Sequence, residues 1–299
     1  MNIIAEGLRF PEGPIAMVDG SVVLVEIERG TLSRVTVGGA IEVIADLGGG
    51  PNGAAIGPDG HCYVCNNGGM IFHTSSAGLL YPGGQPDNYI GGSIQRVSLE
   101  NGEFETIYDE CEGVGLRGPN DIVFDEHGGF WFTDHGKIRE RERDVTGVFY
   151  ARADGSFIEE AIFPLEGPNG IGLSPDEKTL YVAETVPGRT WAFDISEPGK
   201  VDPRSKRMLA LMPDYHLFDS LAVDATGNVC VATIVNGGIT IHTPDGESVK
   251  HVPMPDRITT NICFGGEGLK TAYVTLSTTG KLAAMEWETP GLALNFLNK

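Results

Sequence analysis

The phrase Gly-Pro-Asn-Asp at residues 118–121 decides the fold, because five related phrases occur elsewhere in the chain. They read Phe-Pro-Glu-Gly at 10–13, Gly-Pro-Asn-Gly at 50–53 and again at 167–170, Leu-Phe-Asp-Ser at 217–220, and Ile-Thr-Thr-Asn at 258–261. We call the third residue of each phrase its anchor: Glu12, Asn52, Asn120, Asn169, Asp219 and Thr260. Successive anchors lie 40, 68, 49, 50 and 41 residues apart. Repeats of this length indicate a solenoid or a propeller.

Each anchor begins the same local pattern. Eight residues after the anchor, five of the six repeats have glycine: Gly20, Gly60, Gly128, Gly227 and Gly268. Glycine beside Asp and Pro is typical of a tight turn, and an apolar run such as Phe130-Trp131-Phe132 follows that turn. Each repeat therefore predicts a strand, a turn and a second strand, with enough residues for two more strands. Four strands per repeat predict an all-β fold, a six-bladed β-propeller, with residues 1–299 as one domain.

Two further segments complete the prediction. The tail at Lys281–Trp287 is expected to pair with a strand at Asn2–Ala5 and so to close the ring. The longest interval between anchors accommodates an insertion around residues 71–91, which is rich in Gly, Ser and Pro. Long loops in compact folds are often lids or binding loops, so this insertion is a candidate lid or pocket wall.

The composition excludes several classes of function. The 299 residues include 21 Lys and Arg against 41 Asp and Glu, a formal charge of −20. Nucleic acids are bound by clustered basic residues, and anionic membrane surfaces repel an acidic protein. No apolar run approaches the roughly 20 residues of a membrane span, and five scattered cysteines are typical of a reducing compartment. We expect a cytoplasmic protein with a small-molecule substrate and no nucleic-acid, membrane or protein partner.

The repeat also predicts where the anchors lie. The first strand of every propeller blade lines the central channel, so the anchors converge around the axis at one mouth. They would form a ring of two carboxylates, three amides and one hydroxyl, a donor set that suits Ca, Mg or Mn. Two carboxylates at one mouth repel each other unless they are paired or bound to a metal, and no anchor is Lys or Arg. We therefore expect a bound divalent cation. The alternative is that each Asn or Asp only makes turn hydrogen bonds to the backbone.

The second strand of each repeat is expected to end just outside this ring. Fourteen or fifteen residues after the anchors lie the polar residues Glu26, Asn66, Asp134, Glu184, Thr233 and Thr275. They are candidates for orienting the ring residues by hydrogen bonds, and a second metal near Glu26, Asp134 or Glu184 is a weaker candidate. The alternative is that they are polar residues at strand ends.

Several phrases together resemble the gluconolactonase, regucalcin and luciferin-regenerating-enzyme family. The resemblance rests on Phe-Pro-Glu-Gly-Pro at 10–14, Gly-Pro-Asn-Asp-Ile-Val-Phe-Asp at 118–125, Phe-Thr-Asp at 132–134 and Gly-Pro-Asn-Gly-Ile at 167–171. Phe-Asp-Ser-Leu-Ala-Val-Asp at 218–224 and Phe-Gly-Gly at 264–266 extend it over essentially the whole chain.

This resemblance implies a propeller with one catalytic divalent cation near the centre of its channel. Calcium is the expected cation, with Mg, Mn, Zn and Fe(II) as alternatives. Glu12, Asn169 and Asp219 are the implied metal ligands, Asn120 is implied to contact metal or substrate, and Asn52 occupies the remaining position as a candidate substrate ligand. The chain departs from the family pattern at Ser220, where many members have Gly, and at His135, where bacterial gluconolactonases often have Pro.

The expected reaction is metal-assisted hydrolysis of a cyclic ester of the sugar-lactone type. The cation would polarise the lactone carbonyl and stabilise the oxyanion. Asp219 and Asn120 are the expected catalytic residues: Asp219 activates the attacking water, and Asn120 donates its amide N–H to lactone oxygens. Arg117 is a candidate for binding a substrate hydroxyl or product carboxylate, with a surface ion pair as the alternative. Other candidate pocket residues, each otherwise structural, are His73, His135, His216, Phe72, Tyr89, Trp191 and Phe218.

Two other functions remain open at this point. A related propeller, diisopropyl fluorophosphatase, uses a similar oxygen-ligand calcium site, so the ring chemistry does not separate lactones from organophosphates. A calcium-binding regulator or protein-interaction propeller is the non-enzymatic alternative, and it predicts an exposed apolar or charged patch on one face.

Overall fold

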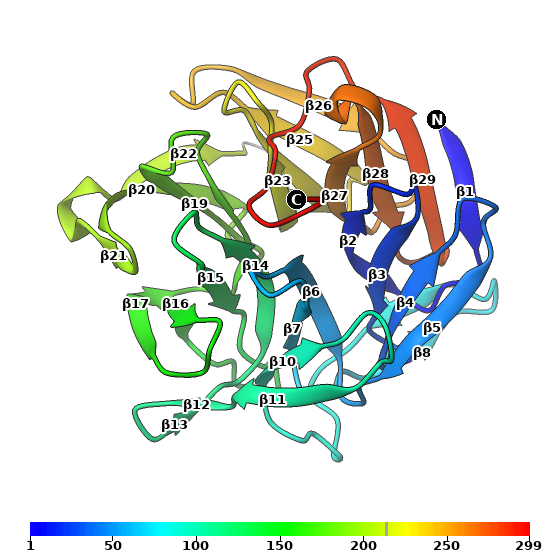
Figure 1. Ribbon diagram of the computed structural model, residues 1–299, viewed down its shortest axis with the longest axis horizontal. Helices are drawn as coiled ribbons and strands as arrows, with labels where there is room; N and C mark the ends of the chain where they lie inside the picture. Colours follow the sequence, from blue (N-terminus) through cyan, green and yellow to red (C-terminus); the bar gives the residue numbers. More distant parts are fainter. Residues whose placement is uncertain (213–214) are drawn as a thin grey trace.

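The computed structural model describes residues 1–212 and 215–299 and shows six antiparallel sheets around a central channel (Figure 1). Each sheet is one blade, so the predicted six-bladed propeller is confirmed. In chain order, the innermost strands of blades 1 to 6 are β2 (Pro11–Ala16), β6 (Pro51–Ile56), β14 (Pro119–Phe124), β18 (Pro168–Leu173), β23 (Leu217–Val223) and β27 (Thr259–Gly265).

The remaining strands of the blades follow outward. The second strands are β3 (Val22–Glu26), β7 (Cys62–Asn66), β15 (Gly129–Asp134), β19 (Thr179–Glu184), β24 (Val229–Ile234) and β28 (Thr271–Leu276). The third strands are β4 (Thr31–Val35), β10 (Ser93–Val97), β16 (Thr146–Arg152), β20 (Arg189–Glu197), β25 (Gly238–His242) and β29 (Lys281–Glu286). The outermost strands are β5 (Ile41–Asp46), β11 (Phe104–Tyr108), β17 (Ile158–Leu165), β22 (Arg207–Leu211), β26 (Val249–Pro253) and β1 (Asn2–Glu6).

Short elements complete the described chain. They are β8 (Phe72–Thr74), β9 (Leu80–Pro82), β12 (Glu110–Cys111), β13 (Val114–Gly115), β21 (Lys200–Val201), and two single 3-10 turns at Pro203–Ser205 and Glu267–Leu269. Within the described residues there is no helix of the length and apolar character needed to cross a membrane.

The N-terminal strand closes the ring. Strand β1 pairs antiparallel with β29, with Asn2 opposite Ala284 and Glu6 opposite Lys281, and the two strands lie side by side in Figure 1. Blade 6 therefore takes its outermost strand from the start of the chain and its other three from the end. This pairing is the one predicted from the sequence.

The core lies between the faces of neighbouring blades. In β15, Phe130 and Phe132 pack with Tyr63 and Phe124 on one side, whereas Trp131 packs with Tyr150 and Leu180 on the other. Successive side chains of a strand point to opposite faces, so the apolar run that follows each turn fills the two spaces beside its blade. Each buried side chain of this size contributes roughly 1.5–3 kcal/mol to folding.

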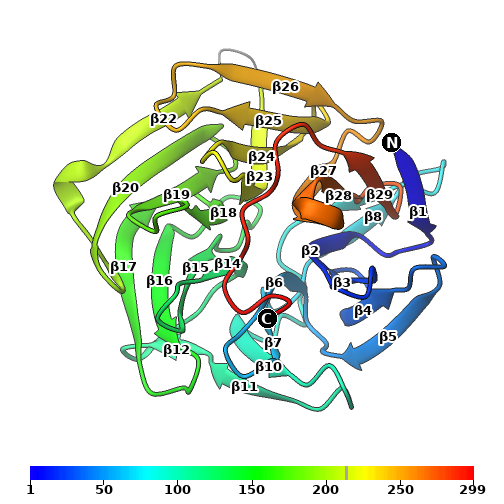
Figure 2. The same ribbon diagram turned by 45° about the horizontal axis from the view of Figure 1, so that its top comes forward.

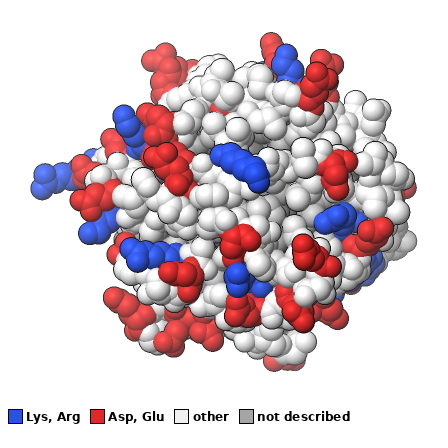
Figure 3. All heavy atoms as spheres, viewed as in Figure 1, with Lys and Arg blue, Asp and Glu red and all other residues white. Residues whose placement is uncertain are grey.

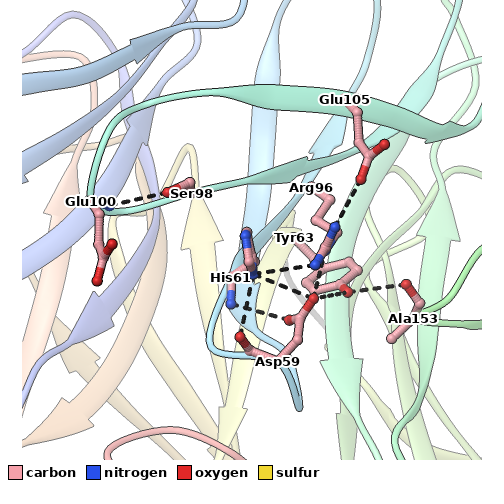
Figure 4. Close-up of polar contacts among 8 residues, drawn as sticks. All are labelled: Asp59, His61, Tyr63, Arg96, Ser98, Glu100, Glu105 and Ala153. Carbon is pink, nitrogen blue, oxygen red and sulfur yellow. Dashed lines mark hydrogen bonds and ion pairs between the residues drawn. The ribbon is translucent and has the colours of Figure 1, made fainter.

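A polar network at the turn between β6 and β7 connects blades 2 and 3 (Figure 4). The Asp59 carboxylate accepts a hydrogen bond from Arg96 Nε, and its Oδ2 lies 3.1 Å from the Tyr63 hydroxyl. That hydroxyl also lies 3.1 Å from the backbone oxygen of Ala153 in blade 3. Arg96 reaches Glu105 as well, at 2.8 Å. The Asp-Gly turn of this repeat therefore also holds two blades together.

The insertion between β7 and β10 forms a roof over the mouth at which the inner strands begin. We call residues 67–92 the roof. Phe72 packs against Phe10 of blade 1, with ring centroids 5.0 Å apart, and Leu80 N donates to Thr278 O of blade 6 at 3.1 Å. On the other side, Gln85 N donates to Ile138 O of blade 3 at 3.0 Å. The roof thus bridges blades 1, 6 and 3.

The C-terminal segment crosses the opposite mouth of the channel, as the red trace in Figure 2 shows. Leu292 N donates to Val223 O at 3.1 Å, Asn295 Nδ2 to Phe124 O at 3.2 Å, and Asn298 Nδ2 to Ala16 O at 3.0 Å. These contacts span blades 5, 3 and 1. Beneath the segment lies a cavity of about 570 Å³.

The face covered by the C-terminal segment carries mixed charge. Figure 3 shows Asp and Glu side chains around its periphery with Lys and Arg scattered among them, and no extended basic patch on this face.

Candidate active site

Every inner strand has a bulge at its anchor. The pairing register with the second strand shifts between Glu12 and Ile15 in blade 1, and corresponding shifts occur in the other five blades. A bulge adds a residue to one strand and re-aims the side chains there. Two consecutive residues in blades 1 to 5, and one residue (Thr260) in blade 6, are thereby left unpaired in the ladder at the same mouth of the channel.

The glycine that follows the anchor in blades 1, 2 and 4 allows neighbouring inner strands to approach closely. A Cβ on Gly53 would lie 2.3 Å from Asn120 O, and one on Gly170 would lie 2.6 Å from Leu221 N. Both distances are too short for any side chain. The Pro-Asn-Gly phrase therefore combines a polar anchor with the contact that sets the width of the channel.

Glu12 and Asp219 come together across the channel mouth, as the ring predicts. Burial raises the pKa of Glu12 well above its usual value, and the negative charge of Asp219 raises it further. Desolvation raises the pKa of Asp219 to about 7, while a hydrogen bond from Asn169 opposes that shift. No ion pair among the described residues involves either carboxylate. Two acidic groups thus face each other without a basic partner.

The hydrogen bonds of Glu12 are asymmetric. Its Oε2 accepts from Gly13 N at 2.5 Å and from Asn261 Nδ2 at 2.7 Å. Its Oε1 is buried and has no hydrogen-bond partner among the described residues, and the same holds for Asn120 Oδ1. A buried oxygen without a donor is costly, and a cation is the ligand that would relieve both the missing bond and the repulsion from Asp219.

The donor set fits a hard divalent cation. Glu12, Asn169 and Asp219 offer two carboxylates and an amide oxygen, which are ligands that Ca and Mg prefer. Asn169 is held by its Nδ2, which donates to Thr185 Oγ1 at 3.1 Å. Within residues 1–212 and 215–299, no three His, Cys, Asp or Glu side chains are grouped as a metal site. Any cation at this mouth would therefore depend on the amide oxygens.

A third acidic residue, Asp121, lies beside this pair and was missed in the sequence analysis. Burial raises the pKa of Asp121 to about 7, and its carboxylate accepts backbone N–H groups of Ile122 and Ile171. It occupies the position after the anchor where three other blades have glycine. That departure from glycine was the signal in the sequence that could have identified it.

The sixth blade differs from the expected ring. The hydroxyl of Thr260 is engaged by Pro11 O at 3.2 Å and by the hydroxyls of Thr275 and Ser277. The next residue, Asn261, is the one that contacts Glu12. The expectation that Thr260 supplies a ring oxygen is wrong, because its hydroxyl is engaged in contacts that join blade 6 to blade 1.

Asn52 and Asn120 line a small inner cavity beneath the roof. Its volume is about 50 Å³, and its wall also includes Gly84 of the roof and His135 and Lys137 of the loop after β15. Burial lowers the pKa of His135 to about 4, so this ring is neutral near pH 7. An open groove of about 620 Å³ lies outside this cavity and shares Gly84 and Ile138 with it.

The ends of the second strands hold the loops that lead into the anchors. In four blades the side chain at the end of the second strand accepts a hydrogen bond from a backbone N–H group of the loop. The pairs are Glu26 with Arg9 N at 2.7 Å, Asn66 with Gly50 N at 2.9 Å, Asp134 with Gly118 N at 2.7 Å, and Glu184 with Glu166 N at 2.6 Å. In each case the donor lies two or three residues before an anchor. These side chains therefore position the anchors through the backbone. Their oxygens are occupied by N–H donors, which argues against a second metal there.

The remaining candidate residues separate into three groups. Arg117 is exposed on the loop before β14, and its guanidinium has no hydrogen bond or ion pair among the described residues. Tyr89, His135 and Phe72 lie at the roof or the inner cavity. His73, His216, Trp191 and Phe218 do not line the inner cavity, and Phe218 is a fully buried core residue.

A six-bladed propeller with an acidic and amide ring at one mouth is thus the class that fold and site define. The chain belongs to the family described as the SMP-30/gluconolactonase/LRE-like region, whose profile matches residues 10–278. It is 26% identical to the gluconolactonase of Zymomonas mobilis over 310 residues, covering 93% of this chain and 79% of that protein. It is 27% identical to lactonase drp35 of Staphylococcus saprophyticus, covering 86% and 73%. The resemblance found in the sequence is confirmed.

Solved structures show the same fold. A gluconolactonase from Xanthomonas campestris superposes with a TM-score of 0.76 at 22% identity, covering 97% of this chain and 88% of that one. The calcium-binding protein regucalcin from Agrobacterium tumefaciens gives a TM-score of 0.71 at 17% identity, covering 99% and 96%.

Proposed function

We propose that this protein hydrolyses lactones of the sugar-lactone type, with a divalent cation held by Glu12, Asn169 and Asp219. The observation that carries the proposal is the carboxylate pair Glu12 and Asp219, which has no basic partner among the described residues and leaves Glu12 Oε1 without a donor. The gluconolactonase and lactonase relatives support the choice of a cyclic ester as substrate. Calcium is the preferred cation because every proposed ligand is an oxygen.

Each side chain at the channel mouth has a separate role in the proposed reaction. When bound, the cation would polarise the ester carbonyl and offset the negative charge that develops on its oxygen. Asp219 accepts a proton from the attacking water on a carboxylate oxygen, as a general base. Asn120 and Asn52 line the inner cavity, where their amide N–H groups can donate to the oxygens of the substrate. Arg117, on the loop just before Asn120, is proposed to bind a hydroxyl or the product carboxylate at the entrance.

We infer that the roof moves when a sugar-sized substrate enters from its side of the channel. The inner cavity of about 50 Å³ is well below the roughly 300 Å³ of a typical ligand pocket. The outer groove and the inner cavity meet at Gly84 and Ile138, where the bond from Gln85 N to Ile138 O holds the roof to blade 3. We infer that separation at this seam admits the substrate. The five free cysteines support a cytoplasmic location for the reaction.

A pH-stat assay tests the proposal. EDTA-treated protein would be offered gluconolactone, an aliphatic lactone and a fluorophosphonate, with Ca, Mg, Mn, Zn or Fe(II) added back. We expect cation-dependent hydrolysis of the lactones. Asp219→Asn should lower kcat by about 100-fold or more because the general base is lost, whereas Asp245→Asn, an exposed change in the same blade, should leave it unchanged.

The outcomes separate the competing functions. If no lactone is hydrolysed faster than in buffer with any cation, the proposal is wrong. Preferential hydrolysis of the fluorophosphonate would instead identify a phosphoryl substrate. Cation binding without any turnover would identify a binding protein.

A further inference from the structure

Lys137 places a buried ammonium group beside Asn52 and Asn120, whose side-chain amides are proposed to bind the substrate. Its side chain is only 5% exposed. Its Nζ donates to Asn67 Oδ1 at 3.0 Å and to Gly69 O at 2.7 Å, both in the roof. Burial lowers the pKa of Lys137 to about 8, so it is mostly protonated near pH 7. Two of its three N–H donors are thus used by neutral oxygens.

The ammonium has no carboxylate partner in the part of the chain that the structure describes. No Asp or Glu there lies within 4.0 Å of Lys137 Nζ. The two nearby acids are engaged elsewhere: Asp134 accepts three backbone N–H groups, and Asp144 is bound by both terminal nitrogens of Arg139. The Tyr89 ring lies 5.2 Å from Nζ, and Asp134 and Asp144 act on the ammonium only from beyond contact distance. A buried charge without a contacting counter-charge is unfavourable, so binding of an anion at this position would be favoured.

The inner cavity has the size of such an anion. Lys137 lines it together with Asn52 and Asn120. A volume of about 50 Å³ is well below the roughly 300 Å³ of a typical ligand pocket, so it suits a small group such as a carboxylate rather than a sugar ring. The amides of Asn52 and Asn120 can add N–H donors to the same group.

We propose that Lys137 binds a carboxylate carried by the substrate, so that the substrates of this site are lactones with a free acid group. This inference rests on the proposed lactonase function. The carboxylate lies in the inner cavity while the lactone carbonyl faces Glu12 and Asp219. A single ammonium with one remaining donor and no arginine in the cavity wall suits a monoanion rather than a phosphate dianion.

Two substrates of similar size test this assignment. Glucarolactone keeps a free carboxylate, whereas gluconolactone has a hydroxymethyl group in its place. We expect the wild-type kcat/KM to be at least about 10-fold higher for glucarolactone, since a charged hydrogen bond at a buried site is worth that much or more. Lys137→Gln keeps donors for Asn67 and Gly69 but removes the charge. It should abolish the preference by raising KM for glucarolactone much more than KM for gluconolactone.

The controls separate recognition from folding. Lys178→Met, an exposed lysine at the far end of blade 4, should change neither substrate. Lys137→Met, which removes charge and donors together, should abolish the preference as well, and thermal unfolding reports whether the roof contact was lost. The proposal would be overturned if Lys137→Gln lowered kcat/KM equally for both lactones, or if the wild type showed no preference between them. Either result would leave the lactonase function standing.

Binding gives a readout that does not require turnover. Calorimetry with glucarate and gluconate on calcium-loaded protein should show tighter binding of glucarate to the wild type, and equal binding of the two acids to Lys137→Gln. If no lactone is hydrolysed but this difference is present, the lactonase proposal fails and the anion site stands. If glucarate binds the variant as tightly as the wild type, the anion site is wrong.

Discussion

The position of each hydrogen-bond donor decides what the acidic residues at the channel mouth can do. Glu12 has both of its donors on Oε2, whereas Asp121 is held by backbone N–H groups of its own and the next blade. Glu12 therefore keeps one oxygen for a ligand, and Asp121 acts as a structural acceptor that ties blade 3 to blade 4. Three carboxyl groups nonetheless share a desolvated region.

This crowding predicts an unusual dependence of stability on pH in the metal-free protein. The pKa values of Glu12, Asp121 and Asp219 are all raised by burial, so between about pH 4 and about pH 7 these three groups bind more protons in the folded state than in the unfolded chain. They make the free energy of unfolding fall as the pH rises through this window, whereas His135 and His242, whose pKa values burial lowers to about 4, offset part of that fall below about pH 6.5. Each tenfold difference in proton affinity between the folded and unfolded states corresponds to about 1.4 kcal/mol. Urea unfolding in EDTA at several pH values measures the slope.

Glu12→Gln is the variant that tests the cause. Removing one carboxyl group should make the slope shallower and stabilise the metal-free protein at neutral pH, while Glu100→Gln, at an exposed position, should leave the slope unchanged. Calcium added at neutral pH should restore stability to the wild type. A slope of the opposite sign, or one unaffected by Glu12→Gln, would contradict the assignment.

At the scale of the strands, the bulge and its glycine determine how the anchors are presented. Gly53 contacts the backbone of Asn120 in the next blade, so the second and third anchors are positioned by one strand contact. The insertion adds the roof over the same mouth. Hydrogen bonds from Lys137 to Asn67 and Gly69 connect the roof to the wall of the inner cavity.

Gly53→Ala should separate these two strands. Its Cβ would lie 2.3 Å from Asn120 O, and relieving such overpacking typically costs about 1–3 kcal/mol. We expect a lower free energy of unfolding together with a fall in lactone turnover, because Asn120 moves. Gly115→Ala is the matched control, since its Cβ would meet only Asp109 O, at 3.9 Å. Equal behaviour of the two variants in urea unfolding would show that the strand contact is not critical.

The blades were predictable because each repeats its turn and its apolar run at a fixed distance from the anchor. The convergence of Glu12 and Asp219 was predictable for the same reason. It was not predictable that Asn261, rather than the anchor Thr260, contacts Glu12. A bulge changes which of two adjacent residues faces the channel. Lys137 was not predictable either: it lies in an irregular loop, and its partners Asn67 and Gly69 belong to another blade's insertion, so no periodicity relates them.

At the scale of the whole molecule, different segments of the chain cover the two mouths of the channel. The C-terminal segment bonds to blades 5, 3 and 1 at one mouth, and the roof bridges blades 1, 6 and 3 at the other. Strand β1 fastens the ring itself. Contacts at both mouths thus enclose the acidic ring, and we propose that the roof is the part that opens for a substrate.

Calorimetric titration of calcium into EDTA-treated protein tests the central claim, that Glu12 and Asp219 are held together by a divalent cation. We predict one site per chain in the wild type, weakened about 10-fold or more by Asp219→Asn or Glu12→Gln and unchanged by Asp245→Asn. Absence of a site with calcium and with the other divalent cations, or a site indifferent to both ring variants, would contradict the account.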